Sequence, residues 1–294
     1  MTRSLSRTWD LVKSSLVSFM ADDALTHGAA MAFYAATSLA PILLIVVAIA
    51  GLVFGDDAAR VALSAQISGL MGGESAELLE TALNSASEES SGAWATVIGL
   101  VTLLVTASGV FGEMQGALNK IWKVKPMTGS LPRLIRARAA SLGLVAALGF
   151  LLLVSLATSA GISALGDFIN ARLPFGSVIL GVVNVVVSFI LIAAMFAAIY
   201  KVLPDRSLRW RDVVVGSLFS SALFTIGKSL IGWYIGSSAV ASSYGAAGGL
   251  LVMMLWVYYS SLIFLLGAEF TRAYSARYGT ASDSEASGQG AFPA

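Results

Sequence analysis

Residues 178–212 decide the fold, and they read VILGVVNVVVSFILIAAMFAAIY (178–200) followed directly by KVLPDRSLRWRD (201–212). The first part carries no charged side chain, whereas the second contains four lysines and arginines. A helix rises about 1.5 Å per residue, so roughly 20 apolar residues cross a hydrocarbon core of about 30 Å. The pattern therefore predicts a transmembrane helix that ends at a basic connection in water.

Five further stretches of this kind occur along the 294-residue chain. Hydrophobic residues make up 57% of the sequence and charged residues only 12%, which are too few to cover the surface of a soluble domain. The apolar stretches are continuous rather than alternating, which favours helices over the strands of a barrel. The predicted fold class is all-α, a polytopic membrane protein with six transmembrane helices near 29–54, 94–112, 139–161, 178–200, 213–235 and 247–268.

Basic residues lie on one side of these predicted helices. Fifteen of the 18 lysines and arginines fall in the N-terminal segment, the connections 113–138 and 201–212, and the C-terminal tail. Only two fall in the other three connections. Because positively charged loops stay in the cytoplasm, the chain is predicted to be N-in/C-in, with both termini cytoplasmic.

This topology divides the chain into a cytoplasmic N-terminal segment (1–28), a six-span membrane domain (29–271) and a cytoplasmic, mostly disordered tail (272–294). The run that follows residue 28 is too long for the hydrophobic region of a signal peptide, so we interpret it as the first membrane helix. The first outer loop, 55–93, is long and acidic. The spacing of its apolar residues predicts short amphipathic helices at 61–71 and 76–83, with a solvated loop as the alternative.

Lys228 is the one basic residue inside a predicted span. Placing a lysine near the bilayer centre costs about 2.5–3.5 kcal/mol on insertion scales, which indicates a cavity, a partner or an anionic ligand. The alternative is that its side chain snorkels to the outer interface, about 10 Å away at helical rise. Further candidates for a substrate cavity are Pro41 in the first span, Tyr244 in the uncharged outer loop 236–246, and Asn184 in the fourth span.

Two carboxylates, Glu113 and Glu269, end helices that run toward the cytoplasm. The helix dipole opposes a negative charge at a C-terminus, so we expect them to pair with nearby basic residues such as Lys120 or Arg272. A polar lock between helices on the cytoplasmic side is the favoured interpretation, and a role in proton coupling is the alternative.

The sequence gives little support for catalysis. Asp22, Asp23 and the only histidine, His27, precede the first span, and we expect His27 to make a polar contact at the interface. With one histidine and no cysteine, a histidine-rich metal centre or a thiolate site cannot be built. The P-loop, HExxH and Gly-x-Ser-x-Gly motifs are missing as well. We therefore expect no enzyme activity, catalytic residue, metal or cofactor, and a net charge of +1 implies no general attraction to nucleic acid.

Five segments of the chain resemble the YihY/virulence factor BrkB family. They are AFYAATSLAP (32–41), LPDRSLRWRD (203–212), SYGA (243–246), LWVYYSS (255–261) and LGAE (266–269). The likeness covers roughly residues 10–275, nearly the whole chain. Within it, Glu269 of the last segment is typical of the family, with no role attached.

The resemblance implies a six-span protein of the bacterial inner membrane without an established biochemical activity. The family is linked by name to virulence, and roles in lipid export or transport in the cell envelope have been suggested for it. An older label, ribonuclease BN, conflicts with this sequence, because phosphodiester chemistry needs metal ligands or acid–base pairs in a solvated cleft.

We therefore expect a transporter or lipid flippase-like protein of the envelope. Its partners would be membrane lipids, with an anionic lipid as a substrate. The alternative is a structural or regulatory membrane protein without transport activity, which organises partners through the loop 55–93. A homo-oligomer or an envelope protein partner is compatible with both.

Overall fold

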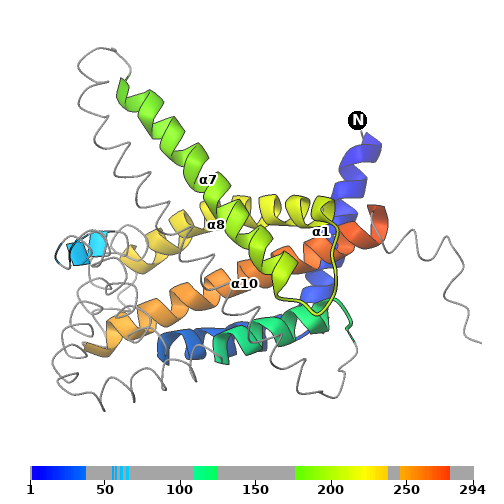
Figure 1. The fold of residues 1–294 in the computed structure, drawn as a ribbon, viewed down its shortest axis with the longest axis horizontal. Helices are drawn as coiled ribbons and strands as arrows, with labels where there is room; N and C mark the ends of the chain where they lie inside the picture. The colour runs from blue at the N-terminus through cyan, green and yellow to red at the C-terminus, as the bar shows by residue number, and fades with distance from the viewer. Residues whose placement is uncertain are drawn as a thin grey trace, which may run out of the picture. The chain divides into compact units, whose positions relative to one another are not determined.

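The computed structural model describes residues 2–37, 55, 57, 60–61, 64–65, 109–124, 176–237 and 246–278. Every regular element in these ranges is helical, which confirms the predicted all-α class for this part of the chain. The labelled helices in Figure 1 are α1 (Thr2–Ala21), α7 (Gly176–Val202), α8 (Trp210–Ser237) and α10 (Ala246–Tyr278). Residues 24–37 and 109–121 are also helical.

Three of the described helices are long and apolar enough to cross a membrane, at Leu180–Val202, Trp210–Gly232 and Leu250–Tyr278. They correspond to the predicted fourth, fifth and sixth spans. The third span candidate extends well past the predicted end at residue 268, because Phe270, Thr271 and Ser275 remain helical and buried. Of the other predicted spans, 139–161 and most of 29–54 and 94–112 lie outside the described residues, and the N-in/C-in orientation stays a prediction.

Helix α1 is an element that the sequence analysis did not predict. Its residues are polar and mixed in charge, so no apolar run marks them. Leu11, Ser15 and Phe19 nevertheless recur every four residues and are all buried, which is the periodicity of a helix with one packed face. In the first outer loop, residues 57, 60–61 and 64–65 are helical, and the remainder of the two short helices expected there lies outside the described residues.

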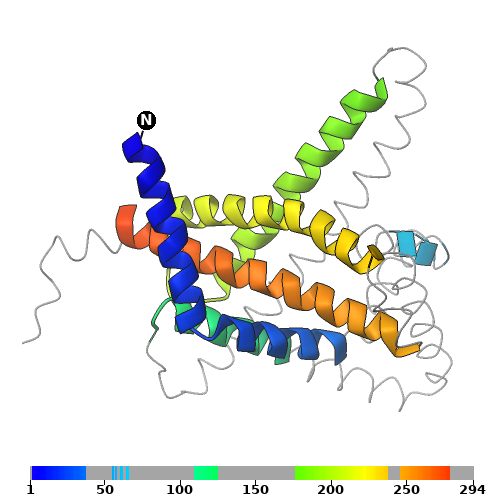
Figure 2. The same ribbon diagram turned by 180° about the vertical axis from the view of Figure 1, so that it is seen from behind.

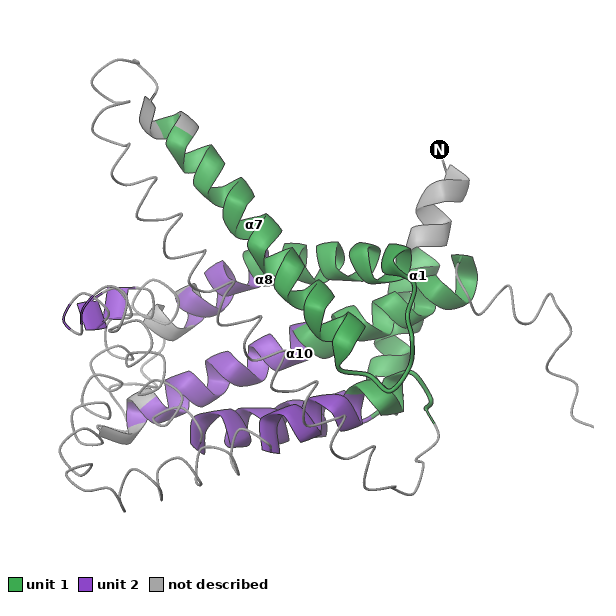
Figure 3. Cartoon of the chain, in the orientation of Figure 1, with its two compact units in different colours: residues 1–22, 118–225, 264–294 green, residues 23–117, 226–263 purple. Residues whose placement is uncertain are grey.

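The chain forms two compact units, coloured separately in Figure 3. Unit 1 comprises residues 1–22, 118–225 and 264–294, and unit 2 comprises residues 23–117 and 226–263. Helices α8 and α10 each contribute residues to both units. The three predicted segments 1–28, 29–271 and 272–294 describe placement relative to the membrane and stay a prediction.

Tyr200 forms the centre of unit 1. Its ring stacks against Phe196 and Phe264, with centroids 6.0 and 5.4 Å away. Its hydroxyl group is 2.8 Å from Ser220 Oγ and donates to the Phe264 carbonyl at 2.7 Å. A buried tyrosine needs a partner for its hydroxyl group, and this one joins α7, α8 and α10 at a single point.

Glycines allow α8 and α10 to lie side by side within unit 1 (Figures 1 and 2). A Cβ added to Gly267 would overlap Ser220 Oγ and lie 2.5 Å from Tyr200 Oη. One added to Gly216 would overlap Thr271 Oγ1. Small residues at such positions let membrane helices pack closely without bulky side chains between them.

Unit 2 packs in the same way. A Cβ on Gly28 would lie 2.8 Å from the Leu262 side chain and 3.3 Å from Tyr258, so the helical residues 24–37 pack directly against α10. A Cβ on Gly227 would overlap the Tyr259 hydroxyl group, which brings α8 close to α10 next to Lys228. Both contacts bring a tyrosine of the LWVYYSS segment, which is half-buried, against a neighbouring helix of unit 2.

Candidate functional site

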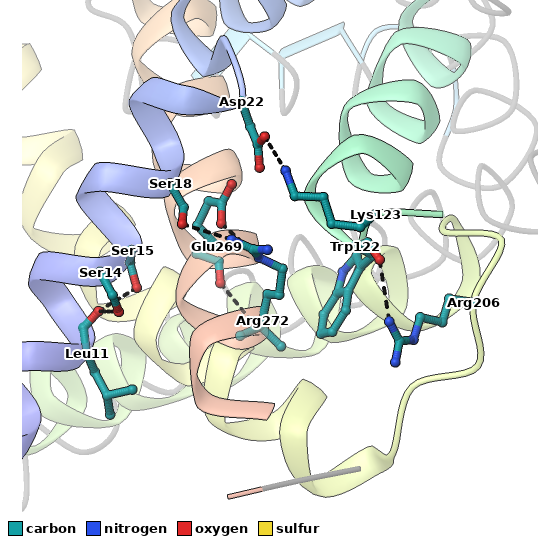
Figure 4. Close-up of polar contacts among 12 residues, drawn as sticks. Leu11, Ser14, Ser15, Ser18, Asp22, Trp122, Lys123, Arg206, Glu269 and Arg272 are labelled. Atoms are coloured by element: carbon teal, nitrogen blue, oxygen red, sulfur yellow. Dashed lines mark hydrogen bonds and ion pairs between the residues drawn. The ribbon is translucent and has the colours of Figure 1, made fainter. Parts of the chain in front are cut away.

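Four charged side chains gather in unit 1 at the ends of helices. Asp22 directly follows α1, Lys123 follows the helical residues 109–121, and Glu269 and Arg272 lie one turn apart on α10. We call these four residues the carboxyl cluster (Figure 4). Lys123 has a positive φ of 51°, a conformation that ends its helix and belongs to the turn from which its side chain reaches Asp22.

Two ion pairs hold the carboxyl cluster. Lys123 Nζ donates to Asp22 Oδ1, and Arg272 Nε donates to Glu269 Oε2 at 3.3 Å. The Arg272 guanidinium group also donates to Ser18 Oγ on α1, at 2.8 Å. Figure 4 shows that these dashed contacts run from α1 to α10 and to the turn at Lys123, so the cluster connects three segments of unit 1.

The two carboxyl groups of the cluster are buried and face each other. Asp22 is 6% exposed and Glu269 only 1%. Figure 4 shows the two side chains next to each other. Among the described residues, no donor reaches Asp22 Oδ2 or Glu269 Oε1, although both atoms are buried. A buried acceptor without a donor costs about 1–3 kcal/mol, so this pair needs a physical explanation.

The basic connection after α7 folds back beside the cluster. Leu203 and Pro204 are buried, and the Asp205 carboxylate accepts from Asn119 Nδ2 at 2.8 Å. Arg206 donates to the Trp122 carbonyl at 3.4 Å and lies 5.7 Å from the centre of the Trp122 ring. The family-like LPDR segment therefore fastens the turn that carries Lys123.

A groove lies beside the cluster between α1 and α10, with a volume of about 560 Å³. Arg272 and Ser18 line it together with Ser14 and Arg277. Arg272 lines the groove and also donates to Glu269, so it lies between the groove and this carboxyl group. Elsewhere in unit 1, Asp212 on α8 accepts from Ser275 Oγ on α10 at 3.0 Å.

The structure brings together part of the polar lock expected from the sequence. Glu269 and Arg272 are in contact within one helix, and their links to other elements run through Asp22 and Ser18. Glu113 contacts His27 in unit 2, with His27 Nδ1 2.6 Å from Glu113 Oε1, and the expected pairing with Lys120 stays a prediction. A cross-helix contact thus exists in each unit.

The sequence alone does not indicate the roles of Asp22 and Lys123. Asp22 stands out only by its position before the first predicted span, and Lys123 is one of many basic residues in the predicted cytoplasmic segments. Neither residue type nor spacing links them to Glu269, because the three residues come from segments far apart in the chain. The available signal was indirect: a carboxylate at a helix C-terminus, opposed by the dipole, implies partners from elsewhere.

Of the four residues expected to line a substrate cavity, the structure describes two, Lys228 and Asn184. Lys228 is half-buried on α8, while the adjacent Ile226 and Leu230 are exposed, at 61% and 58%. No acidic side chain of the described residues pairs with it. Asn184 is exposed on α7. Pro41 and Tyr244 lie outside the described residues, and the residues that are described contain no group of acidic or histidine side chains suited to a metal ion.

The contact between His27 and Glu113 should be measurable as a coupling in stability. Both side chains are about a quarter exposed, so water screens the contact only partly. In a double-mutant cycle of His27→Leu and Glu113→Leu, we expect a coupling energy of roughly 0.5–3 kcal/mol, measured by denaturant unfolding in detergent. Additive losses from the two single variants would show that the contact contributes nothing to unit 2.

Comparisons with known proteins agree with the sequence patterns. The family model described as virulence factor BrkB matches residues 15–290. A UPF0761 membrane protein of Methylibium petroleiphilum is 36% identical over 58% of this chain and 40% of its own length. A UPF0761 membrane protein of Ralstonia nicotianae is 32% identical over 68% of this chain and 44% of its own length. One of Acinetobacter baylyi is 26% identical over 92% of this chain and 63% of its own length. The chain thus spans less than two thirds of these relatives, and no solved structure matches it.

Proposed function

Because the chain belongs to the virulence factor BrkB family, whose similar relatives are named as membrane proteins, we propose that it is a transporter of the bacterial inner membrane. The substrate class is an anionic lipid, moved between leaflets in the manner of a flippase. Both termini lie in the cytoplasm, as the distribution of basic residues predicts.

The observation that supports transport most directly is the position of Lys228. It lies within the membrane-length segment Trp210–Gly232 and is half-buried. Charged residues inside membrane spans are costly, and they face cavities, partners or substrates. With no acidic partner among the described side chains, an anionic headgroup is the counter-charge that fits an ammonium group at this depth.

The immediate surroundings of Lys228 suit a polar ligand. The neighbouring Gly227 lets the Tyr259 hydroxyl group approach the α8 backbone, so a neutral donor from α10 lies beside the stretch of α8 that carries Lys228. A phosphate oxygen accepts from both an ammonium group and a phenol. These two groups are the headgroup ligands that we propose in unit 2.

Reconstitution tests this proposal. The purified protein is placed in liposomes that contain a fluorescently labelled anionic phospholipid in both leaflets, and a membrane-impermeant quencher measures the outer fraction over time. We expect scrambling or net movement faster than in empty liposomes. Liposomes containing a labelled zwitterionic lipid give the matched control. Equal rates with and without protein, in lipids of the native composition, would contradict transport of this substrate.

The structural or regulatory alternative predicts a different result in cells. A protein that organises an envelope partner through the acidic loop should lose its phenotype on deletion of 56–90, while Lys228→Ala should keep it. Transport predicts the loss with Lys228→Ala. A defined envelope partner trapped by crosslinking at that loop, together with these two phenotypes, would support the alternative.

A further inference from the structure

Asp22 Oδ2 and Glu269 Oε1 are two buried acceptors that need an occupant. Lys123 and Arg272 satisfy one oxygen of each carboxyl group and leave the two facing oxygens without a donor among the described residues. Both residues are more than nine-tenths buried, so bulk water does not solvate these oxygens. Three occupants are chemically reasonable for such a pair: a metal cation, a water molecule or a proton.

A metal cation fits poorly. Hard cations take six or more oxygen ligands, while this pair offers only two oxygens without donors. Among the described residues, no three acidic, histidine or cysteine side chains gather in a way that could hold a metal ion. Two cationic side chains, Lys123 and Arg272, already contact the same carboxyl groups and would repel a metal ion. The positive charges around the pair therefore argue against a cation site.

A water molecule also explains the geometry less well than a proton. A water molecule between the carboxyl groups would donate to both oxygens, but it would leave two buried negative charges side by side. A proton on one carboxyl group turns it into a donor, and the other carboxylate accepts. One proton thus satisfies both atoms and removes the repulsion between two buried negative charges.

We propose that Asp22 and Glu269 form a proton-binding site, in which one proton is shared between Asp22 Oδ2 and Glu269 Oε1 at neutral pH. The proton comes from water and returns to water, so no other reactant is needed. The site joins α1 to α10, and it stands independently of whether the protein moves lipid.

The charges that face this site come from every segment packed around it. Lys123 approaches from the turn after residue 121, and Arg272 lies on α10 one turn beyond Glu269. On the α8 side, Asp212 accepts from Ser275, which lies about one turn beyond Arg272 on α10. Arg272 also lines the groove between α1 and α10, which gives water access to the edge of the site.

Infrared spectroscopy detects the proton directly, because a protonated carboxyl group has a C=O stretch that shifts in D₂O and that a carboxylate lacks. We expect the purified full-length protein at neutral pH to show such a band. Glu269→Gln and Asp22→Asn should each remove it, since either change leaves one ionised carboxylate with an amide donor. Asp10→Asn, the same change at an exposed position of α1, should retain the band.

Stability provides the second measurement. The amide of Glu269→Gln supplies the missing donor to Asp22 Oδ2, so the melting temperature should stay close to that of the wild type, whereas Glu269→Ala should lower it. The proposal is overturned if the acid band is absent at neutral pH, or if it persists in both amide variants. It is equally overturned if the wild type has no acid band and its melting temperature rises selectively with Na⁺ or K⁺, which would identify a cation site.

Discussion

Lys228→Met is expected to lower the rate of anionic lipid movement in liposomes to that of protein-free membranes. Methionine has nearly the length of lysine and is apolar, so the change removes the charge with little loss of packing. Lys228→Arg should retain most of the activity, because a guanidinium group also binds phosphate oxygens. The insertion cost of a charge in a span disappears in the methionine variant, so the folded protein should be at least as stable as the wild type.

A matched control separates the position of the charge from its number. Lys13→Met makes the same chemical change on the exposed face of α1 and should leave translocation unchanged. The rate is measured at equal protein density in each liposome preparation. Full activity of Lys228→Met would show that the lysine snorkels to the interface and that another group binds the substrate, if the protein is a transporter.

Helices α7 and α8 were predictable because a continuous apolar segment in lipid has no regular structure open to it other than a helix. A continuous apolar run must satisfy its backbone hydrogen bonds internally, and the basic connection at 201–212 marks where the run ends. Helix α1 was not predictable, because it packs only one face against the rest of unit 1 and much of its sequence is polar. Its periodicity appears only when Leu11, Ser15 and Phe19 are known to be buried.

The candidate site was predictable only in part. A carboxylate at a helix C-terminus is unusual, so Glu269 could be singled out and Arg272, three residues later, could be assigned as a partner. The approach of Asp22 could not be derived, since the turn at Asp22–Asp23 and the turn at Lys123 determine it. Asp23 and Lys123 both adopt positive φ angles, 55° and 51°, which residue patterns do not reveal outside glycine.

Gly267→Ala should strongly destabilise unit 1. The new Cβ would overlap Ser220 Oγ and lie 2.5 Å from Tyr200 Oη, and both of those residues are fully buried. Overpacking of this kind costs about 1–3 kcal/mol. Displacing Tyr200 would also weaken its hydrogen bond to the Phe264 carbonyl, which would lower the free energy of unfolding by about 1 kcal/mol more.

The close contact between Gly267 and Ser220 can be tested by enlarging one of the two residues and shrinking the other. Gly181→Ala adds the same methyl group to α7 where nothing lies within 4 Å, so its melting temperature in detergent should equal or exceed that of the wild type. Ser220→Gly removes the overlapping atoms from α8, and combining it with Gly267→Ala should recover part of the lost stability. Because the rescue depends on direct contact, a double variant no more stable than the sum of its single changes would rule out this packing of α8 on α10.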